Sequence, residues 1–316
     1  MKIDMLRGFF MNKYLFIEKN LEKIIRSNKP VVGLELNSIS KVVPYPQSLN
    51  LAMEIEDIIK SSGAYPATLG IIDGKLIAGL TSSEIAYLLS MDHAPKISTR
   101  DISYFISQKL SGTLTSAAAL FISKLAGIRV LSTAAIGGVH RGAVENFDIS
   151  SDLQELSSTN VAVVCSGVNY IFDIPLTLEY LKTYGVPVVG YTTDIFPAFY
   201  VLDDRLKVEY RIDHPKEIAS LIDTKWNLGI KGGVIVANPV PPACVIDRET
   251  MESYVKMALE KARQSHIDRK DFTSYMIEEI DSYTKGKTMQ YIGEILKNNA
   301  RLSCIISEEL TNLYNE

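Results

Sequence analysis

Short runs of β-branched residues alternate with amphipathic stretches along most of this chain. The runs at residues 30–36, 129–136, 161–165, 186–191 and 233–237 have little polar alternation. Such runs are typical of parallel strands covered by helices on both faces. The amphipathic stretches predict helices near residues 47–62, 114–125, 151–158, 176–184 and 215–228. This order predicts a three-layer α/β/α sandwich with a mostly parallel sheet.

Two segments depart from this alternation. Residues 67–80 contain two strand-like runs around Asp73-Gly74, a dipeptide that favours a type I′ hairpin turn. Thr81 follows this hairpin, with Glu84 at the spacing of a helix capping box. Residues 247–316 have a helical pattern throughout, so we expect the sandwich to end in a helical C-terminal section.

Length and continuity favour a single domain. The chain has 316 residues but contains no internal repeat and no long linker. We therefore predict one domain over residues 29–316, preceded by an N-terminal extension over residues 1–28. No apolar run approaches the ~20 residues of a membrane helix, and the N-terminus lacks the pattern of a signal peptide. A membrane partner is therefore not expected.

Composition narrows the function classes. Lys+Arg number 33 against 37 Asp+Glu, so there is no basic excess for nonspecific binding of nucleic acid. A small anionic ligand stays compatible, because it needs only a local pocket. The three cysteines form no CxxC pair, which favours a reducing, cytoplasmic setting and argues against zinc or a disulfide framework. With four histidines, a multi-histidine metal site is not expected either.

Ligands of α/β sheets bind beyond the carboxyl ends of the strands, so residues that follow strands are the first candidates. Glu35 ends the apolar run VVGL. A carboxylate is costly to bury unless it is paired, which points to a general acid/base role. A structural carboxylate that caps or bridges is an equal alternative.

The stretch GGVHRGAVENFDISSD, residues 137–152, carries the densest candidate chemistry. His140 and Arg141 would supply donors to an anion, and Asp148 would hold a divalent cation through its oxygens. A serine at 150 or 151 would cap a helix whose N–H groups face a phosphate. The alternative is a glycine turn before an N-capped helix, since neither a dinucleotide fingerprint nor a P-loop is present.

Two further segments offer groups to an anion. Lys96 begins a short strand after Pro95 and is either a surface charge or a phosphate ligand. Residues 111–116 open a helix with several hydroxyl groups, which either cap that helix or bind an anion.

Five motifs occur in collinear order from about Lys29 to about Leu310. They are KPVVGLE with PYPQ, GAYPATLGIIDGKLIAGLT, IGGVHRGA with FDISSDLQEL, YLKTYGVPVVGY and GGVIVANPVP. Together they resemble the pseudouridine-5′-phosphate glycosidase family, which includes the indigoidine synthase A-like proteins. The resemblance implies a lyase-type C-glycosidase that reversibly breaks the carbon–carbon bond between ribose 5-phosphate and uracil. It also implies an α/β/α sandwich, a divalent metal, typically Mn²⁺, and a homotrimer.

The same resemblance implies roles for individual residues. Glu35 matches the family's proton donor, Asp148 its metal ligand, and Lys96 a ligand of the sugar phosphate. Substrate contacts are implied at Ser116, His140, Ser150, Ser151 and Asp152.

One departure from the family pattern affects the chemistry directly. Asn169, in VVCSGVNYIFD, occupies the position of the lysine that forms an imine with the opened sugar. A carboxamide is not nucleophilic and cannot form that imine. The other departures at family site positions are Lys41, Val42, Ser116 and Ile292. Because the phosphate and metal side is kept, we predict retained ligand binding with altered chemistry. An amine relocated to Lys41 or Lys96 is a subsidiary hypothesis.

Two functions remain open at this point. The first is an enzyme that makes or breaks the bond between ribose 5-phosphate and uracil or another heterocycle. The second is a catalytically altered or inactive paralogue that binds a sugar phosphate or nucleotide, as a sensor or as a partner in a family trimer. A phosphotransferase is a weaker third reading, because the P-loop is missing.

Overall fold

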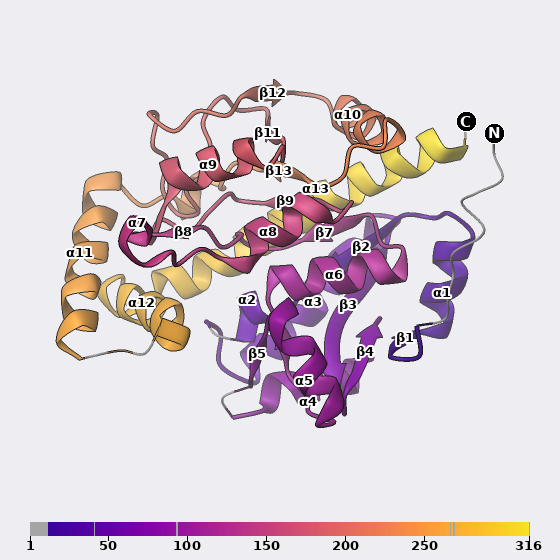
Figure 1. Cartoon of the computed structure of the whole chain (residues 1–316), viewed down its shortest axis with the longest axis horizontal. Helices are drawn as coiled ribbons and strands as arrows, with labels where there is room; N and C mark the ends of the chain where they lie inside the picture. The colour runs from indigo at the N-terminus through magenta and orange to yellow at the C-terminus, as the bar shows by residue number, and fades with distance from the viewer. Residues whose placement is uncertain (1–11, 41, 93, 266, 268, 316) are drawn as a thin grey trace.

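A nine-stranded sheet runs through the whole molecule, with helices on both faces (Figure 1). The computed structural model describes residues 12–315, apart from residues 41, 93, 266 and 268. The strands of the sheet are β1 (Leu15–Ile17), β2 (Val31–Leu34), β3 (Tyr65–Ile72), β4 (Lys75–Ala78), β7 (Val130–Ser132), β9 (Ala162–Cys165), β11 (Val188–Tyr191), β12 (Tyr210–Ile212) and β13 (Val234–Ala237). Their order is β1-β4-β3-β2-β7-β9-β13-β11-β12.

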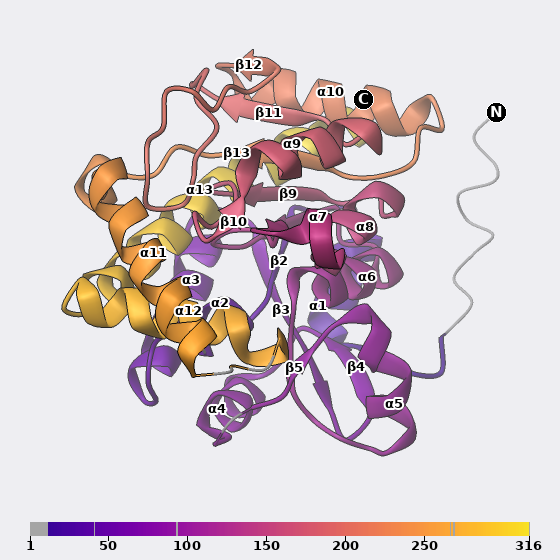
Figure 2. The same ribbon diagram turned by 60° about the vertical axis from the view of Figure 1, so that its left-hand side comes forward.

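The sheet is mostly parallel, as predicted. Within the described chain, neighbouring strands run parallel except where β4 turns back against β3. Helices α6 (Ser116–Ala126), α8 (Ser151–Ser158) and α9 (Ile174–Thr183) cover one face. The other face carries α3 (Gln47–Ser61), α10 (Pro215–Asn227) and α13 (Lys287–Asn315) (Figures 1 and 2). The three-layer sandwich is therefore confirmed.

Shorter elements surround the sheet. The remaining helices are α1 (Lys19–Arg26), α2 (Asn37–Ser40), α4 (Ser82–Ser90), α5 (Ile102–Ser107), α7 (Ala143–Asn146), α11 (Arg248–Gln264) and α12 (Arg269–Tyr283), with 3₁₀ turns η1 (Thr99–Asp101) and η2 (Pro242–Cys244). β5 (Lys96–Ile97) pairs in parallel with β6 (Thr113–Leu114), and β8 (Val139–His140) pairs antiparallel with β10 (Phe172–Asp173). α11 and α12 pack against each other at one end of the sandwich (Figure 1).

Two local predictions are confirmed because they depend on neighbouring residues alone. β3 and β4 form the expected hairpin, and Asp73 and Gly74 have φ of 49° and 73°, as a type I′ turn requires. A side chain at Gly74 would also place its Cβ 2.7 Å from a backbone oxygen of Ile106. At the start of α4, the Thr81 side chain and the Glu84 side chain form the predicted capping box.

The predicted strand at 129–136 is shorter in the structure, because β7 ends at Ser132. Beyond it the chain leaves the regular ladder but stays beside the loop after β9. The Thr133 N–H donates to the Val164 carbonyl at 3.1 Å, and the Ile136 N–H donates to the Gly167 carbonyl at 3.0 Å. These backbone N–H groups therefore have hydrogen-bond partners, and the Thr133 side chain lies at the carboxyl edge of the sheet, where it can bond to another residue.

Part of the segment assigned to an N-terminal extension joins the sheet. β1 pairs in parallel with β4, with Phe16 opposite Ile77. α1 follows it, and Leu21 of this helix is fully buried. Residues 15–26 therefore contribute a strand and a helix to the folded domain.

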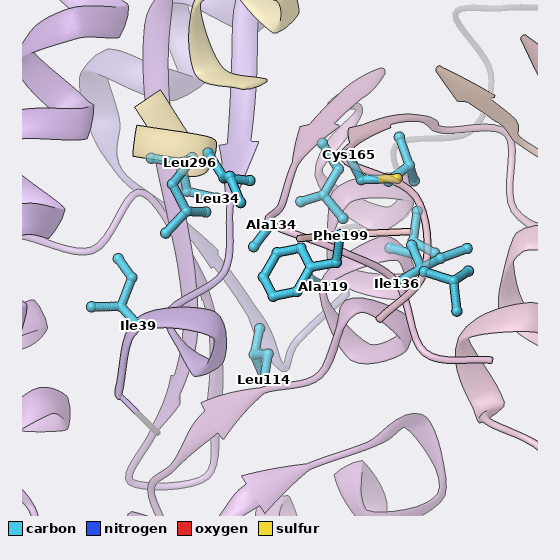
Figure 3. Packing of buried hydrophobic residues seen from close by; sticks show 14 of the residues in the cluster. Leu34, Ile39, Leu114, Ala119, Ala134, Ile136, Cys165, Phe199 and Leu296 are labelled. Atoms are coloured by element: carbon cyan, nitrogen blue, oxygen red, sulfur yellow. The ribbon is translucent and has the colours of Figure 1, made fainter. Parts of the chain in front are cut away.

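A continuous apolar core lies beneath the carboxyl ends of the central strands (Figure 3). Leu34 packs beside Leu296 of α13, with Ala134 and Cys165 nearby. The three cysteines are free and buried. Burial raises the pKa of the Cys165 thiol to about 12, so this residue acts as a small apolar side chain. Among the described helices, none has the length and apolar character needed to cross a bilayer.

Candidate functional site

Glu35 lies directly after β2 and is a buried carboxyl group, 4% exposed. Its Oε1 accepts a hydrogen bond from the Thr133 hydroxyl at 2.9 Å and a second from the Ser38 hydroxyl. Its Oε2 accepts from the Ser38 N–H at 3.0 Å. Burial raises the pKa of Glu35, while these donors oppose the rise by stabilising the carboxylate. The result is a carboxyl group that holds its proton more tightly than an exposed glutamate does.

The loops after three central strands meet at one buried amide. Thr133, Ser166 and Asn238 directly follow β7, β9 and β13, and all three contact Asn299 of α13. Asn299 is 0% exposed. Its Nδ2 donates to the Thr133 carbonyl at 2.9 Å, and its Oδ1 accepts from Asn238 at 2.9 Å. The carboxyl edge of the sheet is therefore tied to α13 by a neutral polar network.

Sequence reasoning missed the residues of this network, although it contained signals for them. Thr133, Ser166 and Asn238 each follow a strand, which is the rule that singled out Glu35. Asn299 falls on the buried stripe of α13, in register with Ile292, Ile295 and Leu302. A polar side chain on such a stripe needs a buried partner.

Hydroxyl groups and a lysine gather at the other end of the site. The Ser98 and Ser151 hydroxyls share a hydrogen bond of 2.7 Å. Ser98 lies two residues after the exposed Lys96, on the segment that begins with β5. Ser150 caps α8, its side chain accepting from the Asp152 N–H at 3.3 Å. Helix N-termini, hydroxyls and an ammonium group are the groups that bind phosphates.

Asp152 is buried and both of its carboxylate oxygens are already engaged. Oδ1 accepts from the Ala117 N–H at 2.7 Å, and Oδ2 accepts from the Gly137 N–H at 2.8 Å. It therefore joins the start of α6, which begins at Ser116, to the turn before β8. Gly137 must lack a side chain, because its Cβ would lie 2.2 Å from the Ser150 hydroxyl oxygen. Asp152 thus shapes the hydroxyl-rich end of the site.

His140 and Asp148 are neighbours across a local backbone pair. The His140 N–H donates to the Asp148 carbonyl at 2.9 Å, and the His140 Nδ1 lies 3.8 Å from the Asp148 Oδ2. Burial lowers the pKa of His140, Asp148 opposes this effect, and the positive charge of Lys96 adds to it. The His140 ring also meets Phe172 edge-on, with centroids 4.7 Å apart. Lys96, His140 and Asp148 therefore form one cluster of ionisable side chains.

Asp148 is the residue that the family resemblance implies as a metal ligand. Its side chain is 33% exposed and its N–H donates to the Asn146 side chain at 2.9 Å. Across the described residues, no three His, Cys, Asp or Glu side chains gather as a metal-ligand set. A cation that keeps most of its waters needs only one or two carboxylates, which fits Asp148.

Arg141 does not act with His140 in the way the sequence led us to expect. Its guanidinium forms two hydrogen bonds to the Glu252 carboxylate, at 3.1 and 3.2 Å. It also donates to the Tyr170 carbonyl at 2.9 Å. Arg141 lines a separate pocket of about 560 Å³ with Arg205 and residues at the start of α9. These bonds commit the guanidinium to α11 and the loop after β9.

Asn169 lies on the loop that follows β9, and its side chain is partly buried. Its Oδ1 accepts from the Ile171 N–H at 3.2 Å, and its carbonyl accepts from the Phe172 N–H at 3.0 Å. Val168, before it, pairs with Ile136. The loop is therefore held beside the segment that leads to His140. Lys41, the other candidate for altered chemistry, lies outside the described residues.

Comparison with known proteins gives a consistent result. The family model described as "Indigoidine synthase A like protein" matches residues 20–309. The pseudouridine-5′-phosphate glycosidase of Caldanaerobacter subterraneus subsp. tengcongensis is 43% identical over 306 residues, covering 97% of this chain and 100% of that protein. The pseudouridine-5′-phosphate glycosidase of Clostridium botulinum is 44% identical, covering 96% of this chain and 99% of that protein.

Two solved structures share the fold over nearly their full length. The prealnumycin C-glycosynthase AlnA, in complex with ribulose 5-phosphate, matches with a TM-score of 0.89 and 32% identity, covering 96% of this chain and 99% of that chain. An indigoidine synthase A-like protein from Thermotoga maritima matches with a TM-score of 0.85 and 28% identity, covering 94% of this chain and 96% of that chain. The sequence matches and the structural matches therefore point to the same family.

Proposed function

The chain belongs to the indigoidine synthase A-like family, and we propose that it is a C-glycosidase of the pseudouridylate synthase type. It makes or breaks the carbon–carbon bond between ribose 5-phosphate and uracil or a related heterocycle. The names of its relatives support this reaction class. The single observation that carries the proposal is Glu35, a buried acid at the same edge of the sheet as the hydroxyl and lysine cluster.

Lys96, Ser98 and Ser151 are proposed to bind the phosphate of the sugar. Lys96 is exposed and supplies a positive charge, while the hydrogen-bonded pair of serine hydroxyls supplies neutral donors. The start of α8 adds backbone N–H groups beside Ser151. These groups orient one end of the substrate, so the sugar carbon that reacts is directed toward the edge of the sheet.

Glu35 is proposed to handle the proton. Cleavage replaces the carbon–carbon bond with a C–H bond on the base and a C–O bond on the sugar, so one proton and one hydroxide from water are consumed. A carboxyl group with a raised pKa keeps the proton that the leaving carbon needs. In the direction of synthesis, the same carboxylate takes that proton back.

Asn169 requires a departure from the imine route implied by the family resemblance. A carboxamide cannot form an imine. Either water attacks the sugar carbon directly, or an amine relocated to Lys41 or Lys96 forms the imine instead. An imine on Lys96 would replace its proposed role as a phosphate ligand. Borohydride reduction with ribose 5-phosphate distinguishes these routes, because only an imine leaves a stable adduct. Peptide mapping then shows whether Lys96 carries it, and Asn169→Lys is expected to create an adduct at position 169.

A divalent cation, with Mn²⁺ as the proposed ion, fits Asp148. Its carboxylate would hold the ion, and waters or substrate oxygens would fill the other positions. When bound, the ion would offset the negative charge of the phosphate. His140 borders this position through its contact with Asp148. Substrate binding measured by calorimetry in EDTA and in added Mn²⁺ tests the assignment.

Assembly and location are also proposals. Val144 and Phe147, next to Asp148, are 77% and 83% exposed, and exposed apolar side chains of this size favour a subunit contact. A homotrimer is proposed, and light scattering measures its mass. Three buried, free cysteines suit a cytoplasmic protein.

The test of the function is turnover. Uracil and ribose 5-phosphate are incubated with the protein and Mn²⁺, and mass spectrometry detects a C-nucleotide; related heterocycles are assayed in parallel. We expect product formation that disappears in Glu35→Gln. Thermal stabilisation by ribose 5-phosphate without product from any heterocycle would instead support a catalytically inactive binding paralogue.

A further inference from the structure

The side chain of Asn299 forms hydrogen bonds to several loops at the carboxyl edge of the sheet. It lies in the middle of α13 and its side chain is fully buried. Nδ2 donates to the Thr133 carbonyl at 2.9 Å and, more weakly, toward the Ala134 carbonyl at 3.5 Å. Oδ1 accepts from Asn238 at 2.9 Å and from the Ser166 hydroxyl at 3.3 Å. One amide thus spans the ends of three strands.

Two of these strand ends lead directly to residues of the proposed chemistry. Thr133, whose carbonyl receives the Asn299 amide, donates its hydroxyl to Glu35 at 2.9 Å. Ser166 begins the loop that reaches Asn169, and its N–H donates to the Ala134 carbonyl at 2.9 Å. The orientation of the Thr133 hydroxyl depends on its backbone, because the residue is 0% exposed and packed on all sides. Fixing that backbone therefore fixes a donor on Glu35.

We propose that Asn299 is a positioning residue that holds the Thr133 hydroxyl against Glu35 and sets the loop of residues 165–169 relative to that acid. The inference rests on the proposed role of Glu35 as the proton donor. Asn299 does not contact substrate in this proposal and acts only through its neighbours. Catalytic geometry is sensitive to such support, since a displacement of about 1 Å can cost about 10²-fold in rate.

The distribution of contacts separates this role from general stabilisation. The phosphate-binding groups Lys96, Ser98 and Ser151 belong to β5, its following turn and α8, and the hydrogen bonds of Asn299 reach other loops. Loss of Asn299 should therefore lower kcat and leave ribose 5-phosphate binding near its original strength. A purely structural residue would lower the folded fraction instead, with unchanged kcat for each folded molecule.

A double-mutant cycle tests the route through Thr133. Asn299→Ala removes the amide, and Thr133→Val removes the hydroxyl while keeping the shape. Each variant should lower kcat by roughly 10- to 100-fold, and the double variant should be no worse than the poorer single variant by more than about threefold. Multiplication of the two losses would overturn the proposal. If Asn299→Ala is recovered unfolded, Asn238→Ala replaces it in the cycle, with a smaller loss and the same non-additivity.

Asn298 provides a matched control in the same helix. Its Nδ2 donates to the Pro239 carbonyl at 3.1 Å. Asn298→Ala should retain kcat within about twofold, because the hydrogen bond it removes reaches Pro239, whereas the bonds to Thr133 and Ser166 belong to Asn299. An equal loss of kcat in Asn298→Ala and Asn299→Ala would show a general effect of α13 and would overturn the specific role.

A second readout does not depend on turnover. The carboxyl carbon of Glu35, labelled with ¹³C and assigned by its absence in Glu35→Gln, is titrated by NMR. Burial raises the pKa of Glu35, and the hydrogen-bond donors that lower it are neutral groups of Ser38, Thr133 and Asn37. Losing the Thr133 hydroxyl bond removes a donor from the carboxylate, so both Thr133→Val and Asn299→Ala should move the midpoint upward.

The two readouts separate failure of this inference from failure of the proposed function. A wild-type protein without turnover, but with the upward shift in both variants, would refute the reaction and keep the positioning role. A shift in Thr133→Val alone would refute the positioning role, whatever the turnover.

Discussion

Around Glu35 the polar groups are neutral and buried, whereas around Lys96 they are charged and reach solvent. The Glu35 carboxyl is surrounded by hydroxyls and an amide network that ends at Asn299. The opposite end gathers Lys96, His140 and Asp148 with two serine hydroxyls. The same edge of the sheet therefore provides two electrostatic environments.

This difference follows from what each end has to do. A general acid must carry a proton when it acts, and burial favours the protonated form because it raises the pKa of Glu35. A phosphate needs positive charge and donors that exchange easily with water, so a binding end stays open. Placing Lys96 beside Glu35 would abolish the first property, because an ammonium group would stabilise the carboxylate.

The largest expected effect is the loss of kcat when the carboxyl group of Glu35, at the buried end of the site, is replaced. Glu35→Gln should lower kcat by about 10²- to 10⁴-fold, the range that a positioned general acid supplies. The affinity for ribose 5-phosphate, measured by calorimetry, should stay within about threefold of wild type. In the proposal Glu35 affects kcat, whereas the groups that bind the phosphate lie at the other end of the site. A parallel loss of affinity would show that the two ends are not independent.

Removing the charge at the open end should have an intermediate effect. Lys96→Ala should weaken ribose 5-phosphate binding by about 10- to 100-fold, the value of a lost charge-assisted hydrogen bond. The loss should shrink at high salt, because exposed charges are screened. Lys207→Ala, at another exposed lysine, serves as the control. Equal affinity in Lys96→Ala and wild type would remove Lys96 from the site.

The smallest effect concerns stability and pH. The raised pKa means that folded Glu35 binds its proton more tightly than the unfolded chain does. This contribution is complete below the unfolded pKa and is lost as pH rises through the folded pKa. Gln cannot ionise, so the free energy of unfolding of Glu35→Gln should rise relative to that of wild type as the pH increases through the folded pKa of Glu35.

Urea unfolding at several pH values measures this gain. Each tenfold change in the acid constant is worth about 1.4 kcal/mol at most. A constant difference between Glu35→Gln and wild type across the range would contradict a raised pKa. Ser107→Ala, on an exposed surface, should show no pH trend of its own.

Local features of the fold were predictable because they depend on neighbours in sequence. The Asp73-Gly74 turn and the Thr81 capping box are properties of a few adjacent residues, and the structure contains both. The strand–helix alternation predicted the sandwich for the same reason. The strand predicted at residues 129–136 was too long. Apolar residues after Ser132 pack in the core, but they do so from a loop and not from a strand.

The candidate site was predictable only in part. Glu35 and Lys96 followed from a strand end and a family resemblance, and the grouping of Lys96 with His140 and Asp148 needed the structure. Arg141 adjoins His140 in sequence, yet its guanidinium is committed to Glu252. Sequence adjacency does not fix the direction of a side chain where a short strand ends.

The sequence by itself determined the alternating layers, the local turns and caps, the family, and the replacement of an amine by an amide at Asn169. Only the tertiary structure decided which residues surround the carboxyl group of Glu35 and so influence its pKa. Thr133 is 98 residues from Glu35, and Asn299 is 166 residues from Thr133. No local pattern joins residues so far apart. They meet because parallel strands end at one edge of the sheet and α13 packs beneath it, where every buried polar group needs a partner.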